Sequence, residues 1–84
     1  GIVPALYNLG YLYDQGKGVS QDCNQAFNLY ELAAKQGNGL AQANLGLMYS
    51  LGKVATKSYK EAFNLFKLSA EQGIKEGQLN LGTI

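Results

Sequence analysis

Residues 26–29, Ala-Phe-Asn-Leu, occur again unchanged as residues 62–65, 36 positions later. The tripeptide Asn-Leu-Gly occurs three times at the same spacing, as residues 8–10, 44–46 and 80–82. A fixed period between about 20 and 50 residues is typical of proteins that stack copies of one supersecondary unit. The sequence therefore predicts two full copies of a 36-residue unit and the beginning of a third.

The apolar residues within each copy have helical spacing. Between positions 5 and 13 they recur at i, i+4, i+7 and i+8, and between positions 26 and 33 at i, i+3, i+4 and i+7. Both patterns place the apolar side chains on one face of a helix. Each copy is thus predicted to form two helices, at roughly 4–14 and 22–36, then 40–50 and 58–72, with a further helix from about 76.

The residues at the predicted helix ends agree with this division. Asp22 and Ser58 are each followed three residues later by Gln or Glu, which predicts an N-cap with a capping box at the start of each second helix. Gly37 and Gly73 follow those helices, where a left-handed residue commonly ends a helix. Neither helix pair can bury its apolar face alone, so stacking of the copies supplies the core.

We therefore expect one all-α domain, divided into repeat 1 (1–36), repeat 2 (37–72) and the first helix of a truncated third repeat (73–84). Leu9 and Leu45, at equivalent positions, are expected to face its core. So short an array is marginally stable, which suggests a fragment of a longer one and allows self-association through exposed terminal repeat faces.

The composition excludes several classes of function. Seven basic residues, all lysines, are spread along the chain against six acidic ones, so neither nucleic acid nor an anionic membrane surface is an expected partner. The chain contains no His, no Arg and a single cysteine, Cys23, so we expect no metal site, no cofactor and no enzyme activity. No apolar run is long enough for membrane insertion. No targeting segment is visible, and the compartment stays open.

A longer pattern gives a family resemblance. Residues 5–37 carry Ala5-x-x-x-Leu9-Gly10-x-x-Tyr13-x-x-Gly16-x-Gly18-Val19-x-x-Asp22-x-x-x-Ala26, closed by Tyr30, Ala33, Ala34 and Gly37. This pattern resembles the Sel1-like repeat, a relative of the tetratricopeptide repeat, and it covers both full copies and the partial third. The second copy departs from it in the loop, where Lys53-Val54-Ala55 replaces Lys-Gly-Val.

The resemblance implies a fold and a function. The implied fold is an α-α superhelix, a right-handed solenoid of antiparallel helix pairs, and the implied function is a non-catalytic adaptor that binds a protein or peptide in its concave groove. The alternative implied by some members is a cysteine-rich secreted protein that binds β-lactams or cell-wall fragments. The paired cysteines of those members are absent here.

By analogy with tetratricopeptide geometry, the resemblance also implies which residues face the concave groove. They are Tyr7, Asn8, Tyr11, Gln15, Leu40, Asn44, Leu47, Leu51 and Asn80. The three Asn residues occupy one repeat position and could pair with the backbone of an extended peptide, or instead hydrogen-bond neighbouring helices. The tyrosines could bind a partner or pack against a preceding repeat. This predicted groove contains no Lys, which argues against RNA.

Three other features have simpler interpretations. The Gly16–Gly18 loop lacks the strand and the Gly-Lys-Ser/Thr ending of a phosphate-binding loop. Cys23 opens a helix, where its thiol could be activated, but Tyr59 holds the same place in the second copy and favours plain packing. The i,i+4 pairs of Glu31 with Lys35 and of Lys67 with Glu71 are expected on a solvated outer face.

Overall fold

The computed structural model describes residues 2–52 and 58–73, which form four α-helices: α1 (Ile2–Gln15), α2 (Cys23–Lys35), α3 (Gly39–Leu51) and α4 (Tyr59–Glu71). All four begin and end within two residues of the predicted bounds. Neither 22–36 nor 58–72 contains a strand. The predicted third-repeat helix and the divergent loop at 53–55 lie outside the described residues.

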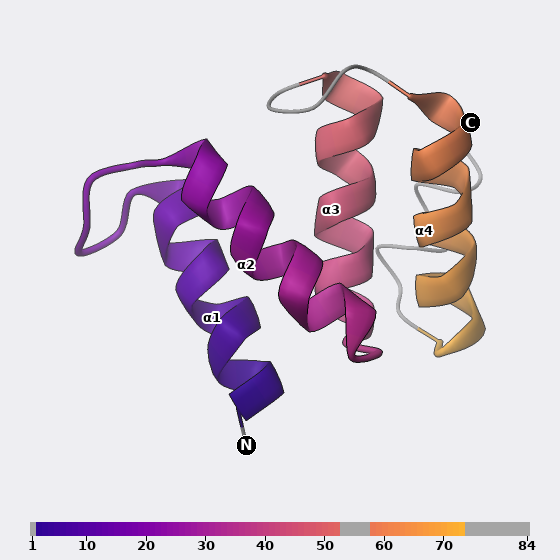
Figure 1. Ribbon diagram of the computed structural model, residues 1–84, viewed down its shortest axis with the longest axis horizontal. Coiled ribbons are helices and arrows are strands. Elements are labelled where there is room, and N and C mark those ends of the chain that lie inside the picture. Colours follow the sequence, from indigo (N-terminus) through magenta and orange to yellow (C-terminus); the bar gives the residue numbers. More distant parts are fainter. Residues whose placement is uncertain (1, 53–57, 74–84) are drawn as a thin grey trace.

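The helices are arranged as two antiparallel pairs placed side by side (Figure 1). Helix α2 lies between α1 and α3, and α4 packs on the other side of α3. Helices that follow one another in the sequence thus pack against one another. The predicted fold class, an all-α solenoid of helix pairs, is confirmed.

The predicted N-caps are present, but the second half of each capping box is not formed as predicted. Asp22 Oδ1 accepts hydrogen bonds from the backbone N–H groups two and three residues ahead, and Ser58 Oγ accepts one from the N–H of Glu61. The backbone N–H groups of Asp22 and Ser58 donate instead to the carbonyls of Tyr13 and Tyr49, each at 3.0 Å. These carbonyls belong to the last turns of α1 and α3, which leave carbonyls without an intrahelical partner. Each of these hydrogen bonds satisfies a cap N–H group and a helix-end carbonyl at once.

Glycine permits close packing inside each helix pair. A Cβ atom at Gly46 would lie 2.7 Å from Cε1 of Phe66, and one at Gly10 would lie 3.0 Å from the ring of Tyr30. Each glycine therefore accommodates an aromatic ring of the second helix in its own repeat. The predicted helix ends are also confirmed, because Gly37 and Gly73 have φ values of 91° and 79°.

The core lies mainly between α2 and α3. Ala26, Tyr30 and Ala33 of α2 pack with Leu45 and Met48 of α3, and all five are buried. The expectation that Leu9 also faces a core is wrong, since Leu9 is 40% exposed whereas its repeat equivalent Leu45 is 4% exposed. Leu45 is covered because α2 precedes α3, and no described helix precedes α1.

Polar groups join the two repeats at the end where α2 meets α3. Gln42 is buried, and its Nε2 donates to the carbonyl of Ala34 at 3.2 Å while its Oε1 accepts from Gln72 Nε2 at 3.0 Å. Nearby, buried Ser69 donates to the carbonyl of Gly39 at 2.8 Å. These bonds hold α4 and the end of α2 against the start of α3.

Candidate protein-binding surface

The residues predicted to face a groove lie on the first helix of each repeat. The α1 members are Tyr7, Asn8, Tyr11 and Gln15, and the α3 members are Leu40, Asn44, Leu47 and Leu51. Asn80 lies outside the described residues. We refer to the eight described residues as the α1–α3 surface.

One contact joins the two halves of this surface. The Nδ2 group of Asn44 donates to the hydroxyl of Tyr7, with 3.5 Å between the heavy atoms, and both residues are half-buried. The Tyr7 ring also packs at a tilt against Tyr11, with centroids 6.4 Å apart, and against Tyr30, at 5.8 Å. The structure therefore brings together three predicted residues from two repeats.

The equivalent Asn residues do not share one environment. Asn8 is exposed, whereas Asn44 is half-buried and contacts Tyr7. The internal hydrogen bond that the sequence left open as an alternative is thus present at Asn44. At Asn8 the amide faces solvent and is available to a ligand.

The prediction that no Lys lies at this surface is wrong. Lys17 Nζ lies 5.6 Å from the centroid of the Tyr11 ring, within the range of a cation–π contact. The loop turns back at Gly16, which has a φ of 69°, and the N–H of Lys17 donates to the carbonyl of Leu12. This turn brings the Lys17 amine back over the Tyr11 ring of α1. It places one positive charge at the edge of the α1–α3 surface.

Apolar side chains extend the surface along α3. Leu51 is 64% exposed at one end of the helix, Leu40 is also exposed near the other end, and Leu47 between them is half-buried. They form a partly apolar wall along α3, and Tyr11 adds an exposed aromatic ring on α1. Such side chains can supply the buried area at the centre of a protein interface.

Tyr30 of α2 is fully buried and packs against the Tyr7 ring. Burial raises the pKa of its phenol well above the ordinary value, and the negative charge of Asp14 adds to the rise. The Tyr30 hydroxyl donates to Asp14 Oδ2 at 3.3 Å. This phenol stays protonated at neutral pH, so it cannot act there as a base. The described residues include no group of His, Cys, Asp and Glu that could hold a metal ion.

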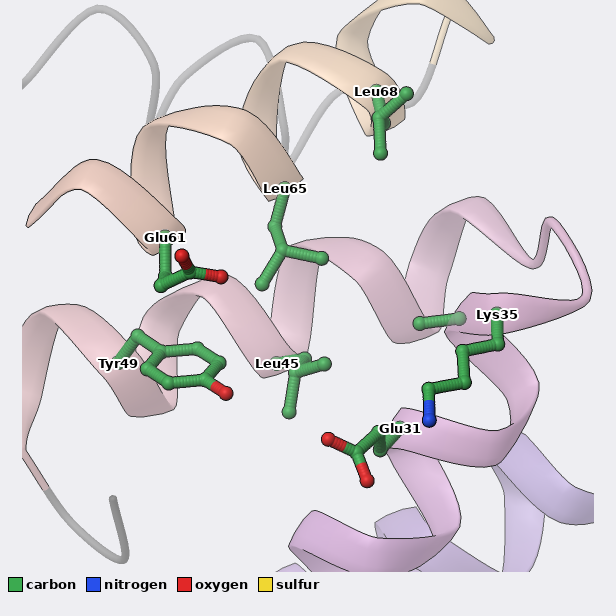
Figure 2. Close-up of a pocket in the computed structure, with 8 residues that line it drawn as sticks. Glu31, Lys35, Leu45, Tyr49, Glu61, Leu65 and Leu68 are labelled. Atoms are coloured by element: carbon green, nitrogen blue, oxygen red, sulfur yellow. The ribbon is translucent and has the colours of Figure 1, made fainter. Parts of the chain in front are cut away.

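Sequence reasoning missed a pocket to which both second helices contribute. It is a pocket of about 220 Å³ between α2, α3 and α4 (Figure 2). We call it the interrepeat pocket; its lining residues are Glu31, Ala34, Lys35, Leu45, Tyr49, Glu61, Leu65 and Leu68. No local sequence signal marks it, because its lining residues come from three helices of two stacked repeats.

The comparisons with known proteins agree with this fold. A family model described as the Sel1 repeat matches residues 3–38 and 39–74. A solved Sel1 repeat protein from Oxalobacter formigenes is similar, with 37% identity over 96% of this chain and a TM-score of 0.91. A protective antigen of uropathogenic Escherichia coli strains, which displays an SLR fold, is 45% identical over 90% of this chain with a TM-score of 0.86.

This chain spans 33% of the first of these solved chains and 16% of the second. No curated protein matches it. Among the helices that the structure describes, none has the length and apolar character needed to span a membrane.

Proposed function

The chain belongs to the Sel1 repeat family, and we propose that it is a non-catalytic scaffold that binds a segment of a partner protein on the α1–α3 surface. Repeats of this family generally mediate interactions between proteins. The observation that carries the proposal is the contact between Asn44 and Tyr7, because it joins the first helices of both repeats into one surface. A ligand on that surface would contact both repeats.

The chemistry of the surface favours a peptide segment with apolar and polar side chains in alternation. Tyr11, Leu40 and Leu51 offer exposed apolar area, and Asn8 offers an amide with both donor and acceptor groups. An extended or helical segment could bury its apolar side chains on the wall while its backbone pairs with the amide. Lys17 supplies a single cation, so charge contributes little to the affinity.

Two features support the absence of catalysis. The sequence contains no His, which is the side chain that titrates nearest to neutral pH. The buried phenol of Tyr30 stays protonated, since burial and Asp14 raise its pKa. We therefore assign Tyr30 a structural role, in which its ring supports Tyr7 of the α1–α3 surface.

The chain is shorter than the two solved proteins that it resembles, and we propose that it works as part of a longer array. In that setting exposed Leu9 would be covered by a preceding helix, as α2 covers Leu45. The apolar face of α1 would also allow two copies to associate.

The experiment that tests the binding proposal compares partner affinity between surface variants. Tyr11→Ala removes an exposed ring of the α1–α3 surface, and Lys67→Ala removes an exposed side chain of α4. We expect only Tyr11→Ala to weaken binding. A larger effect of Lys67→Ala would move the binding surface to the second helices.

A further inference from the structure

The interrepeat pocket has an apolar interior formed by side chains of α3 and α4. Leu45 is buried, Leu65 is half-buried, and Leu68 at the outer edge is 48% exposed. In Figure 2 the side chain of Leu65 extends from α4 toward Leu45 on α3. A ligand that enters this pocket would therefore bury an apolar group there.

Two carboxylates from different repeats stand beside this apolar interior. Glu31 lies on α2 and Glu61 on α4, and both line the pocket together with Tyr49 (Figure 2). The pKa of the Tyr49 phenol is raised by its burial first, and then by the charges of Glu31 and Glu61. Both carboxylates therefore lie near enough to the Tyr49 phenol for their charges to affect it.

The two glutamates are specific to this pocket and are not part of the 36-residue repeat pattern. Leu45 and Tyr49 have Leu9 and Tyr13 as their equivalents 36 positions earlier, so the apolar positions are repeated. The acidic positions are not, because Lys67 is the equivalent of Glu31 and Gln25 that of Glu61. The stacking of repeats thus does not require this pair of charges.

We propose that the interrepeat pocket binds the side chain of a lysine presented by a partner protein. The four-carbon stem of lysine suits the leucine-lined interior, and its compact ammonium group has three donors that can point toward two separate carboxylates. A guanidinium fork matches one carboxylate in a fixed plane, which is a poorer fit to acids on two different helices. This site is distinct from the α1–α3 surface.

Lys35 is the competing cation. It lines the same pocket, one helical turn after Glu31, a spacing at which the two side chains can interact. Figure 2 shows the Lys35 amine and the Glu31 carboxylate on the same side of the pocket. Lys35 already places a positive charge beside Glu31, so removal of that charge should strengthen the binding of an external lysine.

The test is an NMR titration of the leucine methyl groups with a peptide probe. The probe is the acetylated and amidated pentapeptide Gly-Leu-Lys-Leu-Gly, and its control carries norleucine in place of lysine. We expect the methyl signals of Leu65 and Leu68 to shift with the lysine peptide, and the norleucine peptide to bind at least about threefold more weakly.

Four variants separate a specific site from general attraction to acidic groups. Glu31→Gln and Glu61→Gln should each weaken binding by about threefold, and Lys35→Gln should strengthen it by a similar factor. Glu71→Gln, which makes the same charge change at an exposed position on α4 outside the pocket, should leave it unchanged. Equal binding of the two peptides, no shift at Leu65 and Leu68, or an equal loss in Glu71→Gln and Glu61→Gln would overturn the proposal.

Discussion

The side-chain amide of Asn44 donates a hydrogen bond to the hydroxyl of Tyr7, so one contact links α3 of the second repeat to α1 of the first. The two residues are 37 positions apart in the sequence, close to one repeat period. Helices α1 and α3 are separated in the sequence by α2, and the stacking of repeats brings these two residues into contact.

If this hydrogen bond stabilises the fold, the effects of Tyr7→Phe and Asn44→Ala on the free energy of unfolding should not be additive. We expect each variant to lower the free energy of unfolding by about 0.5 to 1.5 kcal/mol, and the double variant to lose less than the sum by about 0.5 kcal/mol. Urea unfolding of the four proteins measures the coupling. Additive losses would show that the hydrogen bond contributes nothing to stability.

Leu45 and Leu9 occupy equivalent repeat positions but should differ in their contribution to stability. Leu45→Ala removes a buried side chain and should cost about 2 to 4 kcal/mol. Leu9→Ala alters an exposed side chain and should cost less than about 1 kcal/mol. Urea melts of the two variants compare them directly, and equal losses would mean that α1 is covered in solution.

Gly46→Ala should destabilise the protein although alanine favours helices. The new Cβ would lie 2.7 Å from Cε1 of Phe66, which is 1% exposed, so the ring or the helix would have to shift. Overpacking of this kind costs about 1 to 3 kcal/mol, more than the gain in helix propensity of about 1 kcal/mol. Gly10→Ala, with a contact of 3.0 Å, is the milder comparison. A thermal melt showing that Gly46→Ala is stabilised would contradict the tight packing of α3 on α4.

The raised pKa of Tyr30 predicts a loss of stability at alkaline pH. The folded chain holds this phenol in its neutral form. Below a pH of about 10, the unfolded phenol is protonated too, and the stabilisation is fully present. Above that pH the unfolded chain releases a proton that the folded chain retains, so the free energy of unfolding falls as pH rises.

Two measurements check this prediction. Phenolate absorbance of the folded protein at alkaline pH should be nearly the same in the wild type and in Tyr30→Phe, because Tyr30 does not ionise. The decline of stability above pH 10 should be shallower in Tyr30→Phe. Early ionisation of Tyr30 would contradict its burial beside Asp14.

The sequence was sufficient to predict features that depend on local chemistry. The caps at Asp22 and Ser58 and the left-handed Gly37 are set by neighbours within one helical turn, and all three are confirmed. The partners of the cap N–H groups were not predictable in the same way. They are the carbonyls of Tyr13 and Tyr49, nine residues earlier and in the preceding helices.

Features that depend on neighbouring repeats were harder to predict. Leu9 has the same sequence context as Leu45, but only Leu45 has a helix before it to cover it. The position of Lys17 over the Tyr11 ring depends on a loop turn, and the pocket between Glu31 and Glu61 depends on stacking. A repeat pattern predicts which residues share a position, whereas burial follows from what packs against each copy.

The most direct test of partner binding at the α1–α3 surface is a calorimetric titration of the partner against three variants at low and high ionic strength. Tyr11→Ala and Leu51→Ala should each weaken binding by about tenfold, because they remove exposed apolar contacts. Lys67→Ala, on the exposed side of α4, should bind like the wild type, and added salt should change the wild-type affinity only slightly, since Lys17 is the surface's single described cation. Full affinity in Tyr11→Ala and Leu51→Ala, with weak binding in Lys67→Ala or in high salt, would contradict the proposal.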